Sequence, residues 1–145
     1  MNKSKTTGEL LEALKKKTTY SEGKKELSGE QYTQSLSAYL NGFVARRDMK
    51  LSDIMHRSGL KKSYFYSLFD GSRENPARDV LIQLCFGFQL SFDETQEFLK
   101  HLGAAQLYPR IARDGVIIYA LHHSMDIIEC DILLAENGEE PLTRV

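Results

Sequence analysis

The residues best suited to specific chemical contacts lie in a short segment, 61–67, which reads Lys-Lys-Ser-Tyr-Phe-Tyr-Ser. On a helix at about 100° per residue, the polar members of this segment share one face, whereas Phe65 and Leu68 share the opposite one. The polar residues are Lys62, Ser63, Tyr66 and Ser67. Ammonium and hydroxyl groups on a free helix face can form hydrogen bonds with base edges in the major groove. The pattern therefore predicts a helix that contacts double-stranded DNA.

Cations flank this segment along the chain. Residues 46–78 carry 8 Lys or Arg and 4 Asp or Glu, whereas residues 79–145 carry 4 Lys or Arg and 11 Asp or Glu. A basic segment attracts the phosphate backbone of DNA and an acidic one is repelled by it. The candidate phosphate contacts are Arg46, Arg47, Lys50, Arg57, Lys61, Arg73 and Arg78. A surface that binds another protein, or an ordinary solvated face, remains an alternative for the same basic stretch.

A second group of residues has the types that bind metal ions. These residues are His122, His123, Asp126, Glu129 and Cys130. Asp126 and Cys130 are four apart and can share a helix face, but a helix start expected at Ser124 separates the two histidines from that face. We therefore expect no metal site and no cofactor. The chain also offers no pairing of a nucleophile with a base and no glycine-rich phosphate loop, so we expect no catalytic residues and no enzyme.

The composition is that of a soluble globular protein. The 145 residues are 41% hydrophobic and 27% charged, with a net charge of −1. No apolar run approaches the roughly 20 residues that span a bilayer, and the basic N-terminal segment lacks the apolar core of a secretory signal. Cys85 and Cys130 lie in apolar stretches and are interpreted as reduced core residues. We expect a cytoplasmic protein that does not bind membranes.

Helix-capping residues and apolar spacing divide the first half of the chain into elements. Residues 1–27 are polar and are expected to form a flexible or partly helical arm. Ser28 opens a helix that ends near Asp48. Ser52 is expected to cap a second, short helix that stops at Ser58-Gly59. A third helix is expected from about Lys61 to Phe69.

Four more helices are expected in the second half. Asn75-Pro76 is expected to open one, and the capping box of Ser91 and Glu94 opens the next, which stops at Gly103. The last two are expected to start near Pro109 and Ser124. The final helix is expected to end at Asn137-Gly138, with residues 139–145 frayed.

The two short helices that meet at Gly59 have the spacing of a helix-turn-helix. Gly59 supplies the backbone freedom that the turn requires. Four apolar residues are expected to hold the two helices together. They are Ile54, Leu60, Phe65 and Leu68.

The stretch from about Leu36 to Leu99 resembles the Cro and lambda-repressor type of helix-turn-helix domain, the xenobiotic-response-element family of bacterial regulators. The matching residues are Ile54, Gly59, Phe65, Leu68, Asp70-Gly71 with Arg73, Pro76, Leu81, Leu84 and Gln89-Leu90-Ser91. The resemblance implies a five-helix bundle, placed here at residues 28–104, and a sequence-specific DNA-binding transcriptional regulator. It also implies that Lys62, Ser63, Tyr66 and Ser67 read bases.

The sequence departs from the family at Met55, where Ala is usual, and at Phe69, where Glu is usual. Helical spacing places Phe69 at the border of the exposed face, beside Tyr66. Aromatic groups bind proteins as readily as DNA. An adaptor that uses the same fold to bind another protein is therefore the alternative function.

Residues 105–145 lie beyond the family's core domain and are expected to form an acidic helical hairpin. Its apolar residues exceed what a two-helix appendage can bury on one face, so we expect it to form a homodimer. The interface candidates are Ile117, Leu121, Ile128 and Ile132. The alternative is a hairpin that completes the core of a monomer. The expected architecture is all-α: a lambda-repressor-like five-helix bundle with a flexible N-terminal arm and an added C-terminal hairpin.

Overall fold

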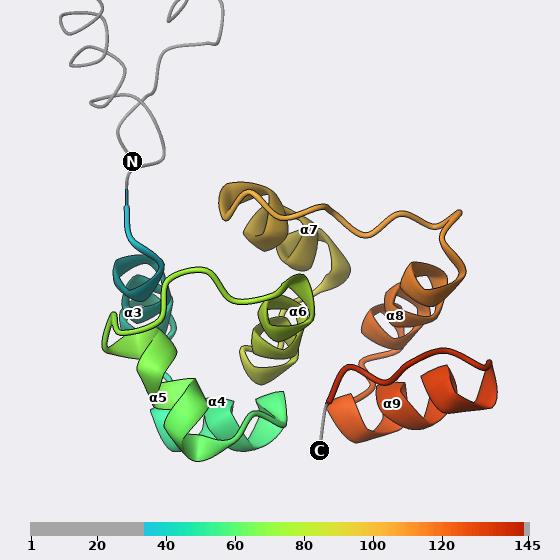
Figure 1. Cartoon of the computed structure of the whole chain (residues 1–145), viewed down its shortest axis with the longest axis horizontal. Coiled ribbons are helices and arrows are strands. Elements are labelled where there is room, and N and C mark those ends of the chain that lie inside the picture. Colours follow the sequence, from blue (N-terminus) through green and yellow to red (C-terminus); the bar gives the residue numbers. More distant parts are fainter. Residues whose placement is uncertain (1–33, 144–145) are drawn as a thin grey trace, which may run out of the picture. The chain divides into compact units, whose positions relative to one another are not determined.

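The computed structural model describes residues 34–143, and Figure 1 shows this part as helices joined by loops. Within it there are seven α-helices and no strand, so the expected all-α class is confirmed for these residues. The helices are α3 (Leu36–Arg47), α4 (Leu51–Ser58), α5 (Lys62–Phe69), α6 (Arg78–Gly87), α7 (Phe92–His101), α8 (Ala112–His122) and α9 (Ile127–Glu136). None of them combines the length and the apolar composition that a membrane span requires. The predicted arm, 1–27, lies outside the described residues.

The first described helix, α3, begins later than the sequence suggests. Ser28 lies outside the described residues, but Gln34 and Ser35 are not helical. Ser35 is the N-cap, and its hydroxyl accepts a hydrogen bond from the N–H of Ala38. The expected continuous helix from Ser28 to Asp48 is therefore wrong, because the helix that ends there begins after Ser35. The predicted end is confirmed, with Asp48 in the left-handed conformation after α3.

The starts of three other helices also differ from the predicted ones. Lys50 rather than Ser52 precedes α4, and no side chain caps it. Ala77 precedes α6, so the chain continues for one residue beyond Asn75-Pro76 before the helix begins. Ile111 precedes α8, two residues after Pro109. In these three helices no side chain caps the first turn.

The helix α9 begins later than the expected start near Ser124. Ser124 has a positive φ of 53° and lies in the loop. Asp126 is the N-cap, and it forms a capping box with Glu129. The capping box of Ser91 and Glu94 on α7 is confirmed, as is the end of α9 at Asn137, followed by Gly138 with φ 73°.

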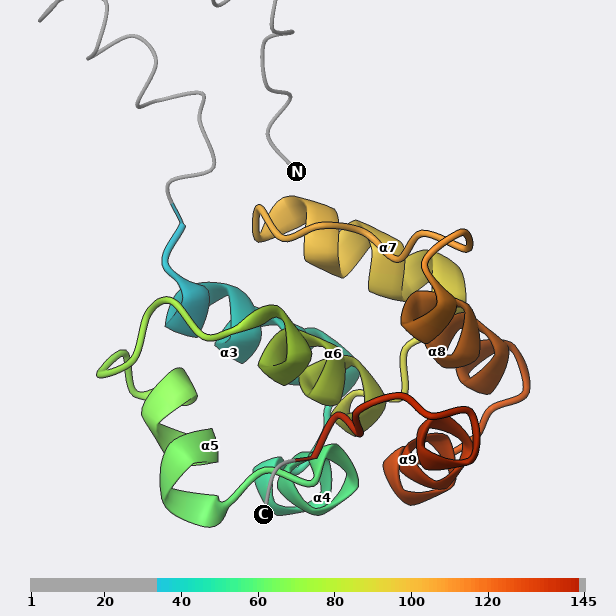
Figure 2. The ribbon, with the colours of Figure 1, turned by 45° about the vertical axis from the view of Figure 1, so that its right-hand side comes forward.

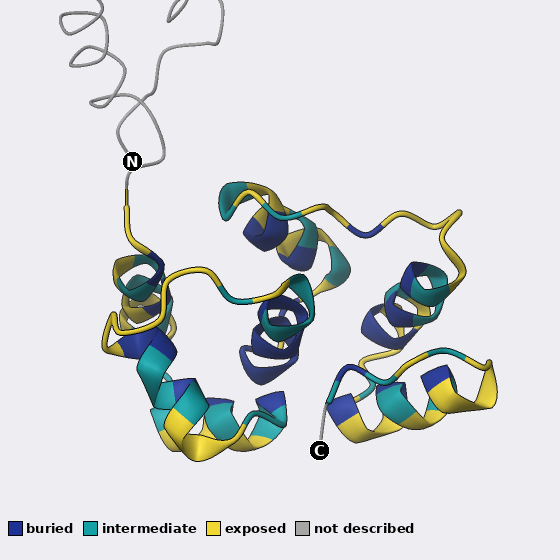
Figure 3. Ribbon diagram, in the orientation of Figure 1, coloured by how far each residue is buried: buried dark blue, intermediate teal, exposed yellow. Residues whose placement is uncertain are grey.

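All seven described helices contribute to one apolar core. Its largest fully buried side chains are Phe65, Phe88, Phe98, Leu40, Ile54, Leu68, Ile82, Leu84, Leu99, Ile117, Leu134 and Leu142. Figures 1 and 3 show α6 in the middle of the assembly, and it is buried along most of its length. Figure 2 shows α8 and α9 side by side as the expected hairpin. Because these two helices share the core, they complete the interior of the single chain.

Two crossed ion pairs connect α6 to α8. Arg78 of α6 pairs with Asp114 of α8, and their chain neighbours form the second pair, Asp79 of α6 with Arg113 of α8. The chain after α9 is also ordered, which corrects the expectation that residues 139–145 are frayed. Leu142 is fully buried, and its N–H donates to the Asp131 carboxylate. Residues 144–145 lie outside the described part.

Candidate nucleic-acid interface

The turn between α4 and α5 has the conformation that the sequence predicts. Gly59 has φ 73° and ψ 9°, in the left-handed region. The N–H of Leu60 donates to the Ser58 hydroxyl oxygen at 3.2 Å, and the buried amide of Gln83 donates to the Ser58 carbonyl at 3.2 Å. These bonds fix the end of α4 against α6, so α5 leaves the turn in a defined direction.

One face of α5 is buried and the other is open. Phe65 and Leu68 are fully buried, as the helical spacing predicts. Phe69 is only 7% exposed, and its ring lies 4.7 Å from that of Phe65 between centroids. The expectation that Phe69 borders the exposed face is therefore wrong. The ring turns into the core, where Phe88 is a further neighbour at 6.5 Å.

The first turn of α5 carries the most accessible of the predicted base contacts. Lys62 and Ser63 are both exposed, and so is Lys61 just before the helix. Their side chains form no hydrogen bond or ion pair within residues 34–143. This short run presents two ammonium groups and a hydroxyl to solvent.

The other two predicted base contacts are more constrained. Tyr66 is half-buried, with its ring edge-on to Phe65 at 5.3 Å. The Ser67 hydroxyl donates to the Tyr64 carbonyl and accepts a hydrogen bond from Nε of Arg73 at 3.2 Å. Ser67 is therefore engaged within the protein, whereas Tyr66 lies at the edge of the open face.

Arg73 is folded back onto α5 from the loop that follows it. Its guanidinium carbon lies 4.5 Å from the centre of the Tyr64 ring. The backbone N–H of Arg73 donates to the Ser67 carbonyl at 3.1 Å. The residue is nonetheless exposed. Stacking on Tyr64 holds this cation beside α5. No local sequence pattern indicated that contact, because it depends on the path of the loop.

The two arginines at the end of α3 differ in their partners. Both guanidinium groups lie 5.3 Å from the Phe43 ring centre. Arg47 also forms an ion pair with Glu94. The pKa of Glu94 is lowered by the backbone N–H of Ser91 and then by the Arg47 guanidinium, so that carboxylate stays charged. Arg46 has no carboxylate partner among the described residues and is the more available cation.

Two other predicted phosphate contacts have structural roles. Nε of Arg57 donates to the Gly87 carbonyl at 3.0 Å, which joins α4 to the end of α6. Arg78 donates to both oxygens of Asp114 and to the carbonyls of Ala105 and Gln106. All the guanidinium nitrogens of Arg78 are therefore used inside the protein, and we leave this residue out of the candidate interface.

Of the cations predicted to contact DNA, five thus remain exposed without a carboxylate partner among the described residues, and we call these five the free cations. They are Arg46, Lys50, Lys61, Lys62 and Arg73. They lie at the end of α3, at the starts of α4 and α5, and just after α5. Together with Ser63 and the edge of Tyr66, they make up the candidate nucleic-acid interface.

The predicted dimer contacts divide into two groups. Ile117 is fully buried and Leu121 is 8% exposed, so both belong to the core of the chain and their assignment to an interface is wrong. Ile128 and Ile132, on α9, are 66% and 55% exposed. Figure 3 shows the outer side of α9 largely exposed. Tyr119 of α8 is also exposed, at 49%, as are Tyr108 and Ile111 in the loop before that helix, each at 52%.

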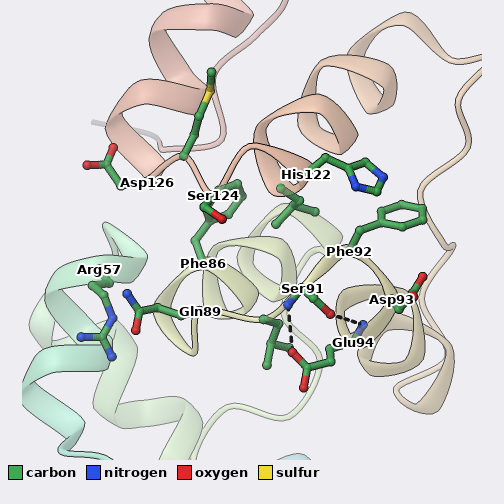
Figure 4. Close-up of a pocket in the computed structure, with 13 residues that line it drawn as sticks. Arg57, Phe86, Gln89, Ser91, Phe92, Asp93, Glu94, His122, Ser124 and Asp126 are labelled. Carbon is green, nitrogen blue, oxygen red and sulfur yellow. Dashed lines mark hydrogen bonds between the residues drawn. The ribbon is translucent and has the colours of Figure 1, made fainter.

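A concave feature lies where the hairpin meets the bundle. It has a volume of about 560 Å³ and is lined by Arg57 of α4, the start of α7 and the loop between α8 and α9 (Figure 4). The Phe92 and His122 rings form one wall, 4.9 Å apart. Figure 4 shows the two hydrogen bonds of the Ser91–Glu94 capping box beside the Gln89 and Arg57 side chains. Much of this cleft's polar lining is thus engaged in ending and starting helices.

The five residues with metal-binding side chains do not form a metal site in the described part of the chain. No group of three His, Cys, Asp or Glu side chains suited to a metal ion occurs within residues 34–143.

Comparisons of the chain with protein-family models, with curated proteins and with solved structures find no match. A functional proposal for this protein therefore depends on the geometry around α4 and α5.

Proposed function

We propose that this protein is a sequence-specific DNA-binding regulator of transcription that uses α5 as its recognition helix. The observation that carries the proposal is the exposed Lys61-Lys62-Ser63 run at the start of α5, directly after the left-handed turn at Gly59. In this proposal Lys62 and Ser63 contact base edges in the major groove, with Tyr66 at the margin. The other free cations neutralise phosphates on either side.

The burial of the aromatic residues supports DNA over a protein partner. The alternative function, an adaptor, depends on an aromatic surface along α5. Phe65 and Phe69 are in the core, and Tyr64 lies under the Arg73 guanidinium. What remains open on α5 is mainly cationic and hydroxylic, which suits a polyanion. A regulator of this kind works in the cytoplasm, where the buried thiols of Cys85 and Cys130 stay reduced.

The test is a titration of the protein into labelled DNA from upstream of its own gene. Binding is measured by fluorescence anisotropy at 50 and 200 mM salt. We expect a specific complex whose affinity falls steeply with salt, because each phosphate contact releases a counterion. Unlabelled competitor of unrelated sequence is the control for specificity. The proposal is contradicted if unrelated competitor DNA displaces the labelled fragment as well as the unlabelled fragment itself does. It is also contradicted if the protein binds at neither salt concentration.

We also propose that the regulator is a homodimer, joined through the outer side of α9. Ile128 and Ile132 lie one helical turn apart and are the most exposed large apolar side chains of that helix. A two-fold contact there covers both and presents two recognition helices to successive turns of the major groove. Light scattering at tens of micromolar is expected to give twice the 16.5 kDa chain mass. A monomer mass, with or without DNA, rules out the dimer.

A further inference from the structure

The chain after α9 returns to the helix-turn-helix along a path held by charged side chains. Nε of Arg113 donates to the Glu140 carbonyl at 2.9 Å, and another of its nitrogens donates to the Pro141 carbonyl at 3.2 Å. The carboxylate of Asp131 accepts the N–H of Leu142 at 2.6 Å and that of Thr143 at 3.2 Å. Side chains from both hairpin helices therefore satisfy the backbone of residues 139–143, which we call the tail.

The tail ends against the turn that precedes the recognition helix. Leu142 is fully buried and borders a cavity of about 300 Å³ together with Leu60 and Tyr64. A Cβ atom built on Gly59 would lie 3.1 Å from Oγ1 of Thr143. The tail thus covers the turn from the side of the hairpin, although more than 80 residues of sequence separate the two.

The start of α5 has few other restraints. Lys61 precedes the helix in an extended conformation, and no side chain caps its first turn. The first four N–H groups of a helix have no partner within the helix, so an uncapped first turn frays readily. The exposed side chains of Lys62 and Ser63 add no contact. Besides the hydrogen bonds of Ser58 and Gln83 at the end of α4, the tail residues beside Gly59 and Leu60 are therefore the remaining support of this turn.

We propose that Leu142 and Thr143 are positioning residues for the recognition helix: by packing under the turn at Gly59 and Leu60, they hold the first turn of α5 in the orientation used to read DNA. The DNA part of this inference depends on the function proposed above. The mechanical part, that the tail orders residues 59–63, does not. A rigid support matters because base contacts require side chains held to a fraction of an ångström.

The experiment uses the ¹⁵N-labelled full chain and compares Leu142→Ala with Leu107→Ala. Leu107 is also buried, at 3% exposed, but lies in the loop before α8, so it controls for a general loss of core packing. We expect backbone order parameters of residues 59–63 to fall from about 0.85 to below about 0.6 in Leu142→Ala only. Asp131→Asn keeps the core intact and is expected to lower the same order parameters to a smaller extent. Leu142→Met should restore them.

DNA affinity is measured on the same variants with the fragment that the wild-type chain binds. Leu142→Ala is expected to lose about tenfold in affinity and Leu107→Ala less than about twofold. Unchanged order at residues 59–63 in both Leu142→Ala and Asp131→Asn, or equal loss in the Leu107 control, overturns the positioning role. A wild-type chain that binds no DNA defeats the proposed function alone, and the order parameters then decide the role of the tail.

Discussion

The carboxylate of Asp114 accepts hydrogen bonds from both terminal nitrogens of Arg78, with N–O distances of 3.0 and 2.8 Å. It also accepts the N–H of Tyr108 at 2.9 Å, and only 3% of the side chain is exposed. Burial acts to raise the pKa of Asp114, but the hydrogen bonds from Arg78 and Tyr108 outweigh it and leave the pKa below its usual value. This residue therefore joins α6, α8 and the loop between α7 and α8 as a charged group.

Asp114→Asn is expected to destabilise the protein by about 2–3 kcal/mol at pH 7, because Arg78 loses its charged partner. A lowered carboxyl pKa contributes stability above the unfolded value of about 3.9, and that contribution is lost as pH falls through the folded pKa. The difference between variant and wild type should therefore shrink below about pH 4. Urea unfolding at pH 7 and at lower pH measures this, with exposed Asp93→Asn as the control. A difference that is constant across pH contradicts the role given to the charge.

Gly87→Ala tests the contact between α4 and α6. A Cβ atom at Gly87 would lie 2.7 Å from the Ile54 carbonyl oxygen and 3.1 Å from Cβ of Ser58, so the two helices must move apart. We expect a loss of about 1–3 kcal/mol in the free energy of unfolding. Gly115→Ala is the matched control, because its nearest neighbour would be at 3.5 Å and Ala favours a helix by up to about 1 kcal/mol. Equal stability of the two variants would disprove the close approach.

Lys62→Ala and Lys50→Ala should affect DNA binding in different ways. Lys62 is proposed to contact a base, so its loss is expected to cost about 1–3 kcal/mol and to relax the preference at one base pair. Lys50 is proposed to contact phosphate, so its loss should lower the salt slope by about one unit and leave the preference unchanged. Lys100→Ala is the control, because Lys100 of α7 is exposed and lies outside the candidate nucleic-acid interface. A site-selection experiment that gives the same preference for Lys62→Ala and wild type rules out the base contact.

Neither cysteine is expected to react in the folded protein. Burial raises the pKa of Cys85 well above its ordinary range, and burial likewise raises the pKa of Cys130 to about 12. A thiolate is the reactive form, so labelling by a disulfide reagent at pH 8 should be slow in buffer and complete in denaturant. Loss of one thiol signal at a time, in single Cys→Ser variants, assigns the sites. Fast labelling of the native chain at either residue contradicts this burial.

Local patterns predicted the elements whose cause is local. The capping box of Ser91 and Glu94 and the turn at Gly59 need only neighbouring residues, and both were found from the sequence alone. Phe69 was misplaced because its helical angle is ambiguous. The aromatic neighbours that draw it inward, such as Phe88, come from another part of the chain.

The role of Arg78 could not be read from its surroundings, because its partner Asp114 lies 36 residues away. A pattern did exist. The sequence Ala-Arg-Asp occurs at residues 77–79 and again at 112–114, at the starts of two helices that pair reciprocally.

The burial of Leu142 also has a consequence for the order of events during synthesis. Leu60 and Tyr64, which line the same cavity as Leu142, and Asp131, which accepts its N–H, all leave the ribosome before it. A nascent chain can therefore form α3 to α9 while the space under the turn is still empty. The turn before α5 therefore acquires the support of the tail only after α3 to α9 have been synthesised, so the order of that turn is established later than the helices around it.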